Sequence, residues 1–162
     1  MSRVAIGFRA EKKLVNLAIV STDDHGGNET LVTEEKLVLQ MDCDPAEALS
    51  ILRKRLITLF DLHSPSSIGV RLADKPQRTA HLQSMFSRAR VEGVILEAAF
   101  SSGIKKIIAG PASTIKSGMK TRTPIRDYLK LDEIRGIDVS GKKKPEFREA
   151  VIAALSALPE GK

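Results

Sequence analysis

Several residue types are scarce in this 162-residue chain, and each scarcity excludes a class of structure. Cys43 is the only cysteine, so an internal disulfide is impossible and a zinc site built on cysteines is not expected. The three histidines fall in unrelated predicted elements with no HxxxH pattern, so we expect no metal site on histidine either. Tryptophan is absent and there is a single tyrosine, which argues against the usual aromatic platform for stacking bases.

Long apolar runs are also missing. No run approaches the ~18 residues needed to span a bilayer, and the first ten residues do not have the pattern of an export signal. We therefore expect a cytoplasmic protein that does not contact membranes. Neither a P-loop nor a GxGxxG motif occurs, so no cofactor is expected. The balance of 42% hydrophobic and 28% charged residues is that of a soluble globular protein, and we expect one domain spanning residues 1–162.

The positive charge is unevenly distributed. The chain carries a net charge of +6, but residues 102–144 alone hold 11 basic and 4 acidic residues, whereas the rest of the chain has a net charge of −1. A cationic excess gathered in one segment favours a polyanionic partner. The plainer alternative is a soluble surface that happens to be cationic.

The hydrophobic pattern predicts the order β-β-β-α-β-α-β-α. Strands are predicted at residues 3–8, 14–21, 30–40, 66–70 and 104–109, and the first two form a hairpin. A helix begins at Pro45, because Asp44 can cap it and Glu47 completes a capping box. Short helices are predicted at 112–116 and 125–131, residues 134–144 form a loop, and Pro145 opens the last helix. This order favours an α/β fold with a mixed five-stranded sheet flanked by helices.

The longest predicted helix covers residues 77–101. Apolar or small residues recur along it in steps of four and three, which predicts one continuous stripe facing the core. We expect Gly93 to allow close packing against a neighbouring element, and Gly103 to cap the carboxyl end. The stripe consists of Leu82, Phe86, Ala89, Gly93, Leu96 and Phe100.

The element order and several segments resemble the RuvC family of Holliday-junction resolvases, whose fold is ribonuclease H-like. The segments are residues 6–11, the run from 88 through 116 and residues 146–155. The resemblance implies a nuclease site in which a cluster of carboxylates holds two divalent metal ions. It also implies a homodimer with the long helix 77–101 at the interface, although Phe86 and Phe100 could equally be intramolecular.

The chain departs from the family at the acids. The places of the first two acids, at the ends of the first and fourth strands, are taken here by Arg9 and Arg71. A guanidinium cannot ligate a metal and repels one. Only the last helix keeps acids, Glu146 and Glu149, one turn apart on one face. We therefore expect a dismantled nuclease site without metal, in which the two arginines either bind phosphate or pair with these two glutamates. The plainer alternative is that both arginines are simply solvated at strand ends.

Three functions follow as hypotheses. The first is a non-catalytic domain that binds structured or duplex DNA, or RNA, through a basic face. Its candidate contacts are Arg9, Arg71, Lys105, Lys106, Lys116, Lys120, Arg122, Lys142, Lys143 and Lys144. The second is a magnesium-dependent nuclease with a non-standard acidic site drawn from Glu11, Asp74, Glu146 and Glu149. The third is a protein-interaction subunit of a larger assembly.

Overall fold

A mixed five-stranded sheet forms the centre of the molecule. The computed structural model describes residues 2–24, 26–75, 82–141 and 144–158. The strands lie in the order β3-β2-β1-β4-β5, with β1–β2 and β2–β3 antiparallel and β1–β4 and β4–β5 parallel, which confirms the predicted sheet. Its strands are β1 (Arg3–Ala10), β2 (Leu14–Thr22), β3 (Thr30–Val38), β4 (Ser67–Arg71) and β5 (Lys106–Gly110).

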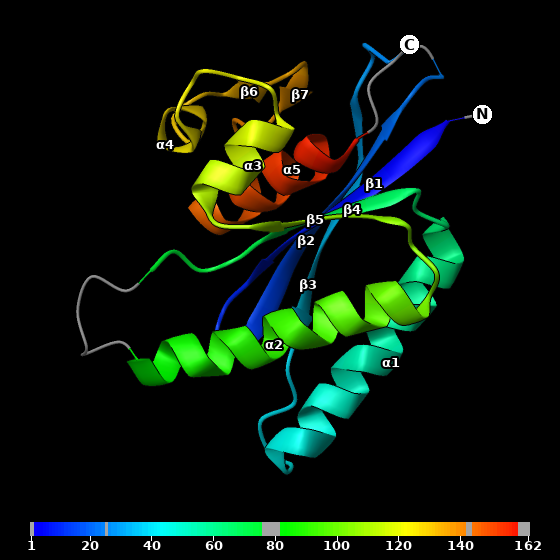
Figure 1. The fold of residues 1–162 in the computed structure, drawn as a ribbon, viewed down its shortest axis with the longest axis vertical. Coiled ribbons are helices and arrows are strands. Elements are labelled where there is room, and N and C mark those ends of the chain that lie inside the picture. Colours follow the sequence, from blue (N-terminus) through cyan, green and yellow to red (C-terminus); the bar gives the residue numbers. More distant parts are fainter. Residues whose placement is uncertain (1, 25, 76–81, 142–143, 159–162) are drawn as a thin grey trace.

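Helices cover both faces of this sheet (Figure 1). The helices are α1 (Pro45–His63), α2 (Leu82–Ser101), α3 (Ala112–Gly118), α4 (Ile125–Tyr128) and α5 (Pro145–Ala157). The first two pack on one face of the sheet, and α5 lies on the other beneath α3 and α4. Alternation along β1 divides the core, since Ile6 and Phe8 face α1 and α2 whereas Ala5 faces α5. No helix within the described ranges is long and apolar enough to cross a membrane.

Two glycines bring α5 unusually close to the sheet. A Cβ atom on Gly7 of β1 would lie 1.9 Å from the carbonyl oxygen of Ala150, and one on Gly69 of β4 would lie 1.9 Å from that of Ala153. The helix presents small side chains there, so its backbone rests directly on two neighbouring parallel strands. The strand residues two positions further along, on the same face, therefore meet the first turns of α5.

Most of the stripe that was predicted to face the core on the long helix faces solvent instead, although Leu96 packs partly against the core. Its aromatic members are exposed, Phe86 by 61% and Phe100 by 79%, while the buried apolar positions are Val91, Ile95, Ala98 and Ala99. Gly93 does not pack closely, because nothing lies within 4 Å of a Cβ built there. The helix carries two apolar rows with the same helical spacing. The row that contains the aromatic residues is the one exposed to solvent. Residues 77–81 of the predicted helix lie outside the described residues.

The region predicted as a loop contains a small hairpin. Strands β6 (Glu133–Ile134) and β7 (Ile137–Asp138) pair across Arg135 and Gly136, which have φ angles of 49° and 80°. The buried guanidinium of Arg148 on α5 donates to the carbonyl groups of Leu129, Leu131 and Val139. These bonds attach residues 129–139 to α5, and α4 ends at Tyr128 rather than continuing to residue 131 as predicted.

We expect Gly69→Ala to lower the free energy of unfolding by about 3 kcal/mol or more, since the added methyl group meets backbone atoms that can yield only by displacing α5. Chemical denaturation measures the change. Gly141→Ala is the matched control, because nothing lies within 4 Å of a Cβ there, and it should change stability by less than about 0.5 kcal/mol. Equal stability of the two variants would contradict the close packing of α5.

Candidate functional site

Two arginines stand side by side where the parallel strands end. Arg9 of β1 is directly opposite Arg71 of β4 in the register, and Arg71 is opposite Gly110 of β5. Each arginine follows its close-packed glycine by two residues, so both side chains project toward α5. The carboxyl ends of β1, β4 and β5 thus form one edge of the sheet, hereafter the carboxyl edge.

Glu149 of α5 lies between these two arginines. Its Oε2 is 2.8 Å from Nε of Arg9, which donates a hydrogen bond to it. The same oxygen is 3.1 Å from Nε of Arg71, an ion-pair contact without hydrogen-bond geometry. The side chain of Arg9 is 16% exposed, that of Arg71 8% and that of Glu149 12%. Neither arginine is therefore simply solvated at a strand end.

Glu146 does not join this contact. It precedes Glu149 by three residues, about 4.5 Å along the helix axis, and is half-buried. No ion pair of Glu146 is found within the described part of the chain. The structure therefore brings Arg9, Arg71 and Glu149 together and leaves the fourth predicted residue outside.

Asp74 holds the other side of the Arg71 guanidinium. Nη2 of Arg71 lies 2.7 Å from Oδ2 of Asp74, and Nη1 lies 3.3 Å from Oδ1, so the pair is bidentate. The Asp74 carboxylate also accepts a hydrogen bond of 3.3 Å from the backbone N–H of Ala112. The hydrogen bonds from Arg71 hold the pKa of Asp74 below its ordinary value. Asp74 is 58% exposed, so its side of the pair is open to exchange with solvent or a ligand.

Helix α2 contributes a further ion pair that the sequence analysis did not predict. Nε of Arg88 lies 2.7 Å from Oε1 of Glu92, and Nη2 of Arg88 donates to the carbonyl oxygen of Arg71. Oε1 of Glu92 also accepts from the backbone N–H of Ala73, 3.0 Å away. Burial first, and then the charge of Arg9, lowers the pKa of Arg88. The sequence shows an Arg–Glu pair four residues apart. It does not show that this pair is buried on the core-facing side of the helix.

The residues of the carboxyl edge do not fit a two-metal nuclease centre. Glu149 and Asp74 are occupied by arginine side chains, and Glu11 accepts a hydrogen bond of 2.8 Å from Asn16 at the β1–β2 turn. Across the described ranges, no group of three or more His, Cys, Asp or Glu side chains gathers in a way that could hold a metal ion. Chemically, the arrangement is a set of guanidinium groups held by internal carboxylates.

The remaining predicted basic contacts are spread over the molecule. Lys105 and Lys106 lie at the amino end of β5, away from the arginines, and Nζ of Lys106 donates to the carbonyl oxygen of Leu158. Lys144 is exposed directly before α5, and Lys142 and Lys143 lie outside the described residues. Three more belong to the layer of α3 and α4: Lys116 is half-buried on α3, and Lys120 and Arg122 are exposed just after it.

The fold defines the class of protein, a ribonuclease H-like α/β domain, and comparison with solved structures specifies it. RuvC of Thermus thermophilus in complex with a Holliday junction substrate matches with a TM-score of 0.67 and 16% identity, over 94% of this chain and 91% of that chain. A second T. thermophilus RuvC structure matches with a TM-score of 0.66 and 16% identity, over 94% and 92%. The yeast mitochondrial Holliday junction resolvase Ydc2 matches with a TM-score of 0.63 and 10% identity, over 94% and 76%.

This chain therefore has the fold of the RuvC-type Holliday junction resolvases, as its sequence predicted. Comparison with protein-family models finds no match, and comparison with curated proteins finds none either.

Removing the carboxylate shared by two arginines should destabilise the fold. We expect Glu149→Gln to lower the free energy of unfolding by about 3 kcal/mol or more, because two largely buried guanidinium groups lose their common counter-charge. Glu146→Gln, one turn earlier on the same helix, should cost less than about 0.5 kcal/mol. Urea denaturation of both variants measures the difference, and similar losses would show that the contact at Glu149 has no special weight.

Proposed function

We propose that this chain, as one domain, is a non-catalytic nucleic-acid-binding protein that retains the RuvC-type fold without its nuclease chemistry. The observation that carries the proposal is the contact of one carboxylate, Glu149, with Arg9 and Arg71, the residues at the places where the resemblance calls for acids. A guanidinium pair gives these positions affinity for phosphate and none for a divalent cation. The solved relative bound to a Holliday junction supports nucleic acid as the partner, with DNA favoured.

The exposed cations of the layer formed by α3, α4 and the β6–β7 hairpin would make most of the contacts. Segment 102–144 supplies the positive excess of the whole chain, and Arg122 has no ion pair among the described residues. Arg126 and Lys130 lie at a loose 3.9 Å from Asp127 and remain exposed. Such contacts read the phosphate backbone and the shape of the duplex rather than the bases. The single tyrosine, Tyr128, is half-buried and bonded to Thr121, so it offers no stacking surface.

The arginines of the carboxyl edge would bind a phosphate group in exchange for one of their carboxylate partners. Arg71 is held by Asp74 in the bidentate geometry that a guanidinium also uses with phosphate. A phosphate could replace this half-exposed carboxylate while Glu149 continues to face both arginines. Asp74 would then weaken binding by competing for the same guanidinium.

We further propose a homodimer through α2. The exposed large apolar residues of α2 are Leu82, Phe86 and Phe100, which are spread along a helix of 20 residues, about 30 Å. Exposed apolar groups gathered on one side of a helix are typical of an interaction surface. As the place of action we propose the cytoplasm, in which the lone Cys43 would stay reduced.

Binding should be strong at low salt and fall steeply as salt rises. Anisotropy titrations of labelled duplex and four-way-junction DNA are expected to give a log–log salt slope of about 0.9 for each neutralised phosphate. Arg122→Ala should reduce that slope by about 1, whereas Lys54→Ala, an exposed cation on the α1 layer, should leave it unchanged. Absence of binding even at low salt would reject the proposal in favour of a protein-interaction subunit.

The same DNA substrates test for surviving nuclease activity. With Mg²⁺ or Mn²⁺ added we expect no specific cleavage, because Glu149 and Asp74 are held by arginines and Glu146 alone cannot fix two metal ions. Specific cleavage that is lost in Glu146→Ala would instead establish the metal-dependent nuclease with a non-standard acidic site.

Asp74→Asn should raise the affinity for duplex DNA about tenfold, since phosphate no longer competes with a charge-assisted hydrogen bond of roughly 1.5 kcal/mol. Asp61→Asn makes the same change in net charge on an exposed residue of α1 and should have a much smaller effect. Anisotropy titrations at one fixed salt concentration compare the two variants. If they behave alike, only the net charge matters and Arg71 does not contact phosphate.

A further inference from the structure

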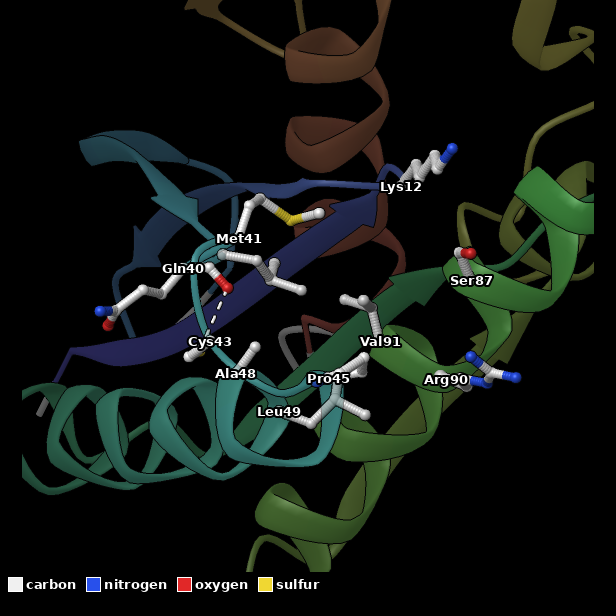
Figure 2. A pocket seen from close by; sticks show the side chains of 11 residues that line it. Lys12, Gln40, Met41, Cys43, Pro45, Ala48, Leu49, Ser87, Arg90 and Val91 are labelled. Carbon is white, nitrogen blue, oxygen red and sulfur yellow. Dashed lines mark hydrogen bonds between the residues drawn. The ribbon is translucent and has the colours of Figure 1, made fainter.

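A hollow of about 180 Å³ opens on the surface between the first turn of α1, the segment after β3 and α2 (Figure 2). Its apolar lining includes Leu39, Met41, Leu49 and Val91. Leu39 and Val91 belong to the core, whereas Met41 is 58% exposed. An apolar cavity of about 150 Å³ can hold a benzene molecule, so the hollow is large enough for one phenyl ring.

Two cations border the hollow. Lys12 lies in the β1–β2 turn and Arg90 on α2, and both side chains are exposed. They are the charged residues that line the hollow, and no ion pair of either is found among the described residues. Arg53 and Arg88 of the two neighbouring helices are instead each paired with a glutamate. The hollow therefore offers two exposed positive charges to a partner.

The side of the hollow around Cys43 is acidic. Cys43 lies away from the two cations in Figure 2. Desolvation, and then the charges of Glu47, Asp42 and Asp44, raise the pKa of Cys43. These three carboxylates are exposed and do not line the hollow themselves. The hollow thus has a basic border toward the β1–β2 turn and α2, and an acidic border at the start of α1.

The lining decides what kind of group fits. Mostly aliphatic walls offer few partners to the polar edges of a nucleobase, which would lose its hydrogen bonds to water, but they suit an aromatic side chain. The three carboxylates near Cys43 would also repel a continuous polyanion. A polypeptide avoids both costs, because it can carry acidic residues on one side of an aromatic anchor only.

We propose that the hollow binds a segment of a partner protein, in which one aromatic side chain enters the hollow and acidic residues on one side of it contact Lys12 and Arg90. On its other side the segment is neutral or basic, because it passes the carboxylates at the start of α1. An aromatic anchor in an apolar pocket with charged contacts at the rim is the usual anatomy of a docking site. The inference is independent of the proposed nucleic-acid binding, which uses the layer of α3 and α4 on the other face of the sheet.

Synthetic peptides test the proposal. The probe is fluorescein-labelled Asp-Asp-Glu-Phe-Gly-Ser-Gly, together with a peptide of the same residues in reverse order, since either chain direction can bring the acids to the two cations. We expect at least one of the two to bind in the micromolar range by fluorescence anisotropy. Replacement of its phenylalanine by alanine should weaken binding by about thirtyfold or more, because the anchor is lost. Equal binding of the alanine peptide would show a purely electrostatic contact and overturn the proposal.

Matched variants separate the specific contacts from overall charge. Lys12→Gln and Arg90→Gln should each weaken peptide binding about fivefold, the weight of an exposed ion pair. Lys54→Gln removes an exposed cation of α1 that does not line the hollow, and it should leave binding unchanged. All three side chains are exposed, so the variants should fold. Equal losses in the three variants would mean that only net charge matters, which contradicts contacts at the hollow.

The lone cysteine reports whether the hollow itself is filled, because Cys43 lines it. At about pH 9, where the raised thiol pKa is less limiting, iodoacetamide should alkylate Cys43 several times more slowly when the peptide is bound. The alanine peptide should give no protection. Cys43→Ser with Leu62→Cys is the control, since Leu62 is 74% exposed on α1 and does not line the hollow, and the peptide should not slow its alkylation.

Other occupants give different results. Protection of Cys43 by duplex or single-stranded DNA, but by neither peptide, would mean that the hollow takes nucleic acid, and the proposal would fail. Protection that rises with the concentration of the chain alone would mean that a second copy fills the hollow, with the same consequence. If neither peptide binds even at several hundred micromolar, the docking site is rejected, whereas the DNA titrations are measured separately and keep their own outcome.

Discussion

The close approach of α5 to two glycines is the constraint on which the carboxyl edge depends. Because Gly7 and Gly69 have no side chains, the helix backbone lies against β1 and β4, and Glu149 reaches both strand ends at once. A larger residue at either glycine would lift the helix and separate the carboxylate from two guanidinium groups. Steric fit therefore comes first, and the electrostatic contact is its consequence.

That contact gives the edge its chemical character. A carboxylate between two largely buried arginines is already compensated, so it has little capacity left for a cation. Arg71 is bound from its outer side by a more exposed acid, Asp74, and this pair is the part of the cluster that a phosphate can reach. The edge thus combines a rigid interior contact with an exchangeable outer one. The fold is that of RuvC-type resolvases, and the proposed loss of chemistry rests on this change of charge.

The long helix separates two surfaces with different uses. Its inner row packs in the core through Val91, Ile95, Ala98 and Ala99. The Arg88–Glu92 pair on this side is attached to the segment after β4. Its outer row carries the exposed aromatic residues Phe86 and Phe100. The proposed nucleic-acid surface lies on the opposite layer, at α3 and α4, so a dimer through α2 would leave the basic layers of both copies accessible (Figure 1).

The order of strands and helices, the mixed sheet and the segment that holds the positive excess were readable from the chain alone. Alternation, caps and turns are local patterns, and charge is additive along a sequence. The buried side of α2 was not readable, because two rows with equal spacing compete and only packing against the sheet decides between them. The grouping of Arg9 with Glu149, 140 positions later, was expected only through a family resemblance. Tertiary structure paired Asp74, one of the candidate acids, with Arg71, added Arg88 and Glu92 and left Glu146 out. The distance of α5 from the sheet and the path of the chain after β4 decide which side chains meet.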